Sequence, residues 1–185
     1  MSVFPKAYAD SVARLRVVTG FVLVLAFAWL ALPDVKSLAL GLPLSLGGLL
    51  LRAWAAGHLA KNVSLAESGP FAYVRNPLYL GTLLVASGLV IASRRWLLAG
   101  LFAAVFVLIY LPVIQLEQQH LRQLFPSFAA YSRRVPSLWP ALRPVKSGAR
   151  FQWKLYLRNQ EYQALLGFLA GEAFLIAKAF FSHAA

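Results

Sequence analysis

The sequence predicts an all-α integral membrane protein: a bundle of about five transmembrane helices with a cytoplasmic segment of helix and loop. The chain has 185 residues, of which 60% are hydrophobic and only 13% are charged, and its mean hydropathy is +0.67. A soluble domain is less apolar than this. Long apolar runs alternate with short basic or polar segments throughout the chain, so we expect one membrane domain over residues 1–185.

Five apolar runs are long enough to count as spans. They cover residues 17–32, 37–60, 78–93, 96–114 and 162–181. The first run is short, but its helix can begin earlier, near Asp10, with arginine stems reaching the interface. A cleaved signal peptide is the alternative, which the membrane-like character of the later chain disfavours. Only Arg94 and Arg95 separate the third and fourth runs, which predicts an antiparallel hairpin.

The distribution of charge predicts an orientation. The net charge is +12, and most basic residues lie before the first run, in residues 61–77 and in residues 115–160. Alternating spans put these three segments on one side, which the positive-inside rule assigns to the cytoplasm. The basic residues then face membrane lipids and no nucleic-acid partner is needed. We expect the bacterial inner membrane, with residues 61–77 and 115–160 forming a cytoplasmic, cofactor-binding face.

The composition also limits the chemistry. Cysteine is absent, which excludes disulfides and thiolate chemistry. The three histidines are scattered, and we expect no metal site.

Residues 68–81 form a polar loop that leads into the third run. Gly69-Pro70 is a turn signal, and Asn76-Pro77 is typical of a helix start. Free amides and the positive end of a helix dipole at this point favour an anion such as a carboxylate. An ordinary junction between loop and membrane helix is the alternative.

Two ionisable residues stand in apolar surroundings. Arg52 lies within the second run, where a charge is costly and marks either a functional site or a pair inside the bundle. Glu117 shares a predicted helix face with Ile114 and Leu121. A bound cation or a ribose-like diol would satisfy this carboxylate, and a salt bridge to Arg52, Arg75 or a local arginine is the alternative.

Two blocks of sequence resemble a known enzyme superfamily. The first runs from Gly69-Pro70-Phe71 to Arg75-Asn76-Pro77-Leu78-Tyr79-Leu80-Gly81. The second, two spans later, comprises Glu117-Gln118-Gln119-His120-Leu121, then Phe125 to Tyr131 and Val135-Pro136. Together they resemble the isoprenylcysteine carboxyl methyltransferase and phospholipid methyltransferase superfamily of integral membrane enzymes. The resemblance covers roughly residues 50–140.

The resemblance implies a cofactor and its contacts. The cofactor is S-adenosylmethionine, bound at the cytoplasmic mouth of the bundle. The residues implied to contact it are Leu65, Ala66, Phe71, Asn76, Pro77, Leu78, Tyr79 and Glu117. The chain departs from the family pattern by having Asn76 for a histidine, Phe71 for a tyrosine, Gln118 for a glutamate and Pro126 for a glycine. Val113 stands where the eukaryotic prenylcysteine enzymes carry an acceptor-binding arginine.

The predicted function is methyl transfer from S-adenosylmethionine to a membrane-embedded, lipid-like acceptor. Carboxyl O-methylation of an isoprenylcysteine-like molecule is one form, and N-methylation of a phospholipid-type amine is the alternative. A non-catalytic scaffold or small transporter that retains the fold is a third reading. Candidates to orient the acceptor or move a proton are Arg52, His58, His120 and Arg134. The spacing Gly167-x-x-x-Gly171 predicts a homodimer.

Overall fold

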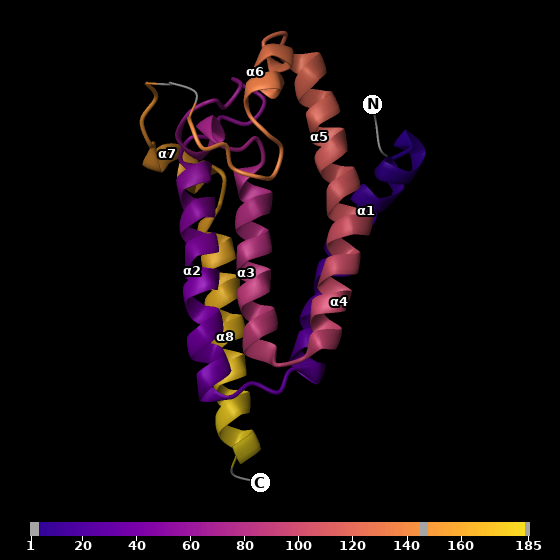
Figure 1. The fold of residues 1–185 in the computed structure, drawn as a ribbon, viewed down its shortest axis with the longest axis vertical. Coiled ribbons are helices and arrows are strands. Elements are labelled where there is room, and N and C mark those ends of the chain that lie inside the picture. The colour runs from indigo at the N-terminus through magenta and orange to yellow at the C-terminus, as the bar shows by residue number, and fades with distance from the viewer. Residues whose placement is uncertain (1–3, 145–147, 184–185) are drawn as a thin grey trace. The chain divides into compact units, whose positions relative to one another are not determined.

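The structure is a computed structural model that describes residues 4–144 and 148–183 (Figure 1). Within these ranges the regular elements are all helical and no strand occurs, as predicted. The elements are α1 (Lys6–Leu30), α2 (Val35–Ala56), the 3₁₀ turn η1 (Gly69–Ala72), α3 (Pro77–Ser93), α4 (Trp96–Val105), the π-helical turn η2 (Phe106–Tyr110), α5 (Leu111–Leu124), α6 (Phe128–Arg134), α7 (Trp153–Arg158) and α8 (Tyr162–His183).

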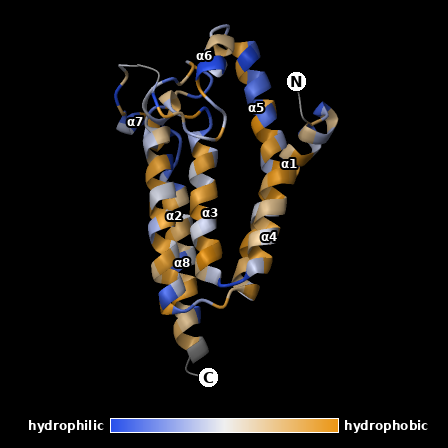
Figure 2. Cartoon of the chain, in the orientation of Figure 1, coloured by the Kyte–Doolittle hydropathy of each residue, from blue (hydrophilic) through white to orange (hydrophobic). Residues whose placement is uncertain are grey.

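Among the described residues, four helices are long and apolar enough to cross a membrane. They are α1, α2, the continuous run Trp96–Leu124 through α4, η2 and α5, and α8. The remaining predicted span, 78–93, forms α3, which is apolar but only 17 residues long. Figure 2 shows hydrophobic residues along these helices and hydrophilic ones gathered at the end of α5 and in α6.

Two predicted boundaries shift. The first helix starts at Lys6, earlier than the apolar run suggested. The second stops at Ala56 instead of residue 60. Gly57 follows the last helical residue, and its amide still bonds to the carbonyl of Ala53. Glycine is a poor helix former and a common helix end, so His58 lies beyond the helix.

The described chain forms two compact units. The described residues of the first are 4–43, 86–120 and 171–183. Its core consists of Ala31, Ala92, Leu98 and Leu175. The predicted tight turn at Arg94–Arg95 joins α3 to α4, and Arg94 also pairs with Asp34 at 2.6 Å.

The second unit comprises residues 44–85 and 121–170. In it the later half of α2 lies against the start of α3. A Cβ on Gly48 would stand 2.5 Å from the carbonyl oxygen of Gly81, and Ser45 donates a hydrogen bond to the carbonyl of Val85 at 3.0 Å. Only residues without side chains allow two helix backbones to approach this closely.

The second unit also holds the chain from 148 to 161 against the end of α2. The amide of Gln152 donates to the carbonyl of Gly57 at 2.9 Å. The side-chain amide of Asn159 donates to the carbonyls of Ala56 and Leu59 at 2.9 and 2.8 Å. Carbonyls at a helix end lack intrahelical partners, so Asn159 caps α2 from 103 residues away.

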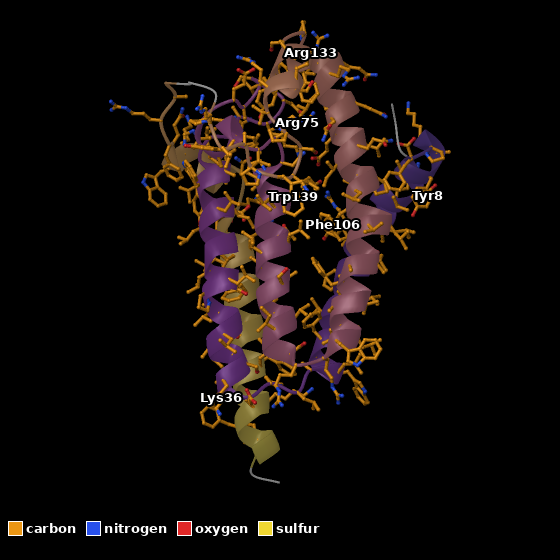
Figure 3. All side chains as sticks on the ribbon, in the orientation of Figure 1. Tyr8, Lys36, Arg75, Phe106, Arg133 and Trp139 are labelled. Carbon is orange, nitrogen blue, oxygen red and sulfur yellow. The ribbon has the colours of Figure 1, made fainter. Side chains whose placement is uncertain are left out.

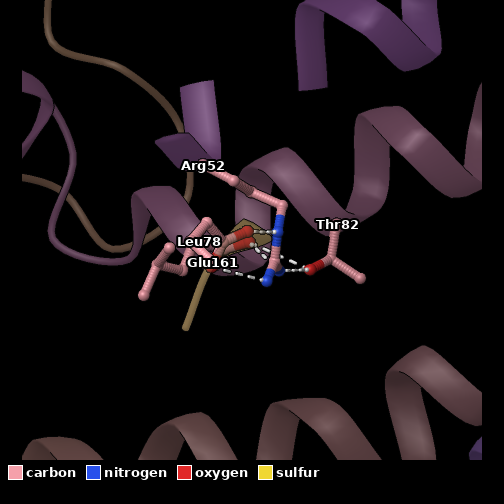
Figure 4. Close-up of polar contacts among 4 residues, drawn as sticks. All are labelled: Arg52, Leu78, Thr82 and Glu161. Carbon is pink, nitrogen blue, oxygen red and sulfur yellow. Dashed lines mark hydrogen bonds and ion pairs between the residues drawn. The ribbon is translucent and has the colours of Figure 1, made fainter. Parts of the chain in front are cut away.

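A buried ion pair fixes the start of α8 in this unit (Figure 4). Arg52 on α2 donates from Nε and Nη2 to the two carboxylate oxygens of Glu161, at 2.5 and 3.0 Å. Its Nη1 donates to Thr82 Oγ1 at 2.6 Å and to the carbonyl of Leu78 at 3.3 Å. This fork geometry suits a guanidinium and a carboxylate removed from water.

Candidate functional site

The loop before α3 is held by the chain that follows α6. As predicted, α3 begins at Pro77, and the amide of Leu80 bonds to the carbonyl of Asn76 at 3.0 Å. The amides of Arg75 and Asn76 donate to the carbonyls of Pro136 and Ser137 at 2.9 and 3.1 Å. The amides of Arg75 and Asn76 are therefore used by the protein itself, and the anion site at the first turn of α3 stays a prediction.

Asn76, where the family pattern has a histidine, serves the same junction. Its side-chain amide donates to both the carbonyl and the hydroxyl oxygen of Ser137, each at 3.0 Å. It is only 8% exposed. The side chain thus links the two motif blocks, a role that sequence analysis did not foresee because Ser137 is 61 residues away.

A second link between the blocks comes from Tyr131 on α6. Its hydroxyl donates to the carbonyl of Phe71 at 2.8 Å, and it packs with Phe128 and Val135 in a small core. Burial raises the pKa of Tyr131 well above its usual range, so the hydroxyl stays protonated and donates. Arg75 lies in the loop between η1 and α3 (Figure 3), and burial lowers the pKa of its guanidinium.

Replacing Tyr131 with phenylalanine is expected to lower the free energy of unfolding by about 1–2 kcal/mol, because the buried carbonyl of Phe71 loses its donor. Thermal unfolding in detergent measures the change. Tyr156→Phe is the control: no hydrogen bond joins the Tyr156 hydroxyl to another described residue. Equal effects of the two changes would contradict the role given to the Tyr131 bond.

A cavity of about 330 Å³ opens beside this loop in the second unit. It is lined by His58, Ala60, Ser64, Leu65, Ala66, Glu67, Ser68, Ala149, Arg150, Gln152 and Leu155. This volume is at the lower end of the range for small-molecule sites. The lining mixes apolar side chains with polar and charged ones, and it includes Leu65 and Ala66, which the resemblance implies contact the cofactor.

His58 is the one proposed catalytic residue that lines the cavity. Its Nδ1 lies 2.9 Å from the hydroxyl oxygen of Ser68. A Cβ on Gly69 would stand 2.6 Å from the His58 ring, and Gly69 has a φ of 57°, so a larger residue there would strain the backbone and displace the ring. Burial lowers the pKa of His58, which keeps the imidazole neutral near pH 7.

The other predicted site residues in this unit lie outside the cavity lining. Phe71, Asn76 and Pro77 are buried in the loop junction. Leu78 and Tyr79 are half-buried in the first turn of α3.

Two of the proposed catalytic residues in this unit, Arg52 and Arg134, lie outside the cavity lining. Arg52 is bound to Glu161, which is the paired alternative weighed from the sequence. Arg134 is exposed at the end of α6, with its Nε 3.4 Å from the carbonyl of Ala130.

Glu117 and His120 lie on α5 in the first unit, and both are exposed. The predicted helix over this stretch is confirmed. The apolar residues of α5 differ in burial: Ile114 is 3% exposed, whereas Leu124, the last residue of the helix, is 41% exposed. The role of Glu117 in cofactor binding stays a prediction.

Among the lining residues that sequence analysis missed are the charged and amide side chains of Glu67, Arg150 and Gln152. Gln152 lies in residues 151–162, where interleaved aromatic and basic residues are typical of a segment at the membrane interface. Arg150 directly precedes this segment and is one of many basic residues in the chain. The charge pattern by itself gives no sign that these residues face a cavity.

The comparisons with known proteins agree with the resemblance. The sequence model of the phospholipid methyltransferase family matches residues 15–127. The chain is similar to the cobalt-zinc-cadmium resistance protein CzcN of Cupriavidus metallidurans, with 38% identity over 49% of this chain and 43% of the relative. It is similar to the nickel-cobalt-cadmium resistance protein NccN of Alcaligenes xylosoxydans xylosoxydans, with 32% identity over 54% and 48%.

The match thus spans about half the length of these curated relatives. No solved structure matches the chain. The family match covers more than half of the chain and takes in the first motif block and the start of the second. On this ground the chain belongs to the phospholipid methyltransferase family, within the superfamily of isoprenylcysteine carboxyl and phospholipid methyltransferases.

Proposed function

We propose that the protein is an integral membrane methyltransferase that uses S-adenosylmethionine and acts on a lipid-like acceptor. The observation that carries the proposal is the cavity at residues 64–68, which directly precedes the motif block of a methyltransferase family. The helices long enough to span a membrane support an acceptor that enters from the bilayer. We propose the bacterial inner membrane, with the cavity on the cytoplasmic side.

The residues that line the cavity fit S-adenosylmethionine. Leu65, Ala66 and Leu155 offer apolar contacts for a nucleoside, while Glu67 and Arg150 offer charges for an amino-acid group. When bound, the cofactor supplies a methyl group made electrophilic by its sulfonium. The protein then needs to orient donor and acceptor and to exclude water. The buried junction around Asn76 and Tyr131 keeps the cavity-lining loop in place for this.

The acceptor atom decides whether a proton must be removed. An amine loses a proton on methylation, and neutral His58 in the cavity wall can accept it. A carboxylate acceptor needs no base but needs a cationic partner, and Val113 stands where the family arginine would be. His58 therefore favours a phospholipid-type amine, and carboxyl O-methylation of an isoprenylcysteine-like molecule is the competing acceptor.

A second candidate function is suggested by the names of the relatives, which are metal resistance proteins. Among residues 4–144 and 148–183 no group of three or more histidine, cysteine or acidic side chains is placed to hold a metal ion. We propose that a part in metal resistance, if this chain shares it with the relatives, runs through methyl transfer to a membrane component. A scaffold or small transporter that keeps the fold is the non-catalytic alternative.

Isothermal titration of S-adenosylmethionine into the detergent-purified protein tests the proposal. We expect saturable binding. The resemblance implies a cofactor contact from Glu117, and on that prediction Glu117→Ala weakens binding by roughly 1.5–3 kcal/mol, the scale of a hydrogen bond to a charged group. Gln123→Ala, an exposed change on the same helix, is the control and should bind as the unchanged protein does. A folded sample that binds no S-adenosylmethionine would rule out the enzyme and leave the scaffold.

A further inference from the structure

The cavity is completed by a part of the chain that the family match does not reach. The match ends at residue 127, yet Ala149, Arg150, Gln152 and Leu155 form one side of the lining. The opposite side comes from residues 58–68, inside the match. A ligand in this cavity therefore contacts a wall that lies outside the residues matched by the family model.

This wall is fixed in place by contacts on either side of it. The amide of Gln152 is bonded to Gly57, and Asn159 caps the end of α2. The Phe151 ring lies against Gly57, where a Cβ would overlap it. Further along, Glu161 forms its two hydrogen bonds with Arg52. These contacts hold residues 151–161 against the end of α2, beside the cavity.

The cavity carries one group of each fixed charge. Glu67 is its acidic residue and Arg150 its basic one. No hydrogen bond or ion pair within the described chain joins either side chain to another residue. Burial lowers the pKa of His58, so Arg150 supplies the positive charge near neutral pH. A pair of opposite charges in one polar cavity complements a zwitterion.

From this we propose that the segment 148–161 is a cofactor-binding wall, in which Arg150 binds the carboxylate of the amino-acid end of S-adenosylmethionine and Glu67 binds its ammonium group. The proposal rests on the proposed function, because it names the residues that hold one end of that cofactor. It places the nucleoside on the apolar part of the lining, at Leu65 and Ala66.

Titrations with three related compounds test the assignment. S-adenosylmethionine carries both charges, decarboxylated S-adenosylmethionine lacks the carboxylate, and methylthioadenosine lacks the whole amino-acid end. We expect Arg150→Ala to weaken binding of S-adenosylmethionine by about tenfold to a hundredfold and to leave the other two unchanged. We expect Glu67→Gln to weaken binding of the first two compounds and to spare methylthioadenosine.

Arg143→Ala is the matched control: both arginines are exposed, but Arg150 lines the cavity and Arg143 does not. A loss equal to that of Arg150→Ala would show a general effect of charge and overturn the assignment. The assignment would also be overturned if Arg150→Ala weakened the binding of all three compounds equally, or if it left the binding of S-adenosylmethionine unchanged. If the unchanged protein binds none of the compounds, the proposed function itself fails.

Discussion

Arg52→Ala is expected to lower the free energy of unfolding by about 3–5 kcal/mol, because it leaves the carboxylate of Glu161 buried without its cation. The Glu161 side chain is 9% exposed and that of Arg52 is 22% exposed. Arg52 also loses its bonds to Thr82 and Leu78, so α2, α3 and the start of α8 all lose one shared contact. Unfolding in detergent, followed by circular dichroism, measures the loss.

The double variant Arg52→Ala/Glu161→Ala should recover part of this loss, since no charge is then left buried. Arg94→Ala is the control: it breaks the other ion pair, to Asp34, in which the arginine side chain is 56% exposed. That change should cost no more than about 1 kcal/mol. If Arg52→Ala left stability unchanged but abolished turnover, Arg52 would be the acceptor contact that sequence analysis proposed.

Gly48→Ala is expected to destabilise the protein by about 3 kcal/mol, the upper end of the usual cost of overpacking. The new Cβ would stand 2.5 Å from the carbonyl oxygen of Gly81 and 2.7 Å from the amide nitrogen of Val85. Both atoms belong to the backbone of α3, so no rotation of a side chain relieves the contact. The two helices must separate, and the measurement is again unfolding in detergent.

Gly47→Ala provides a control one residue away. No atom lies within 4 Å of a Cβ at Gly47, and alanine is favoured over glycine within a helix by about 1 kcal/mol. This change should be neutral or stabilising. If both alanine variants behaved alike, the close contact between α2 and α3 would not contribute to stability.

The helices could be predicted from the sequence because their causes are local. Apolar runs gave the elements, and Asn76-Pro77 marked the start of α3 to the residue. The ends were less certain: α2 stops at Ala56, where Gly57 outweighs an apolar pattern that continues to residue 60. The predicted span 78–93 forms the apolar helix α3, whose 17 residues fall short of the length of the other candidate spans.

The motif residues were found, but their partners were not. The side chain of Asn76 binds Ser137, a partner that the sequence did not indicate, and its contact with the cofactor stays a prediction. For Arg52 the sequence left two alternatives, a functional site and an ion pair inside the bundle. Its partner in the ion pair, Glu161, lies 109 residues further along the chain. Of the proposed catalytic residues, the structure places His58 in the cavity wall and leaves Arg134 exposed.

The sequence by itself determined the membrane character, the helices and the family, because hydropathy, helix caps and motif spacing are properties of short stretches of chain. Only the tertiary structure decided which polar groups satisfy one another and which line the cavity. Arg150 and Glu67 are unremarkable in the sequence, being separated by 82 residues that carry many other charges. The folding of residues 148–161 onto the end of α2 brings both into one cavity lining, through contacts that no local pattern encodes.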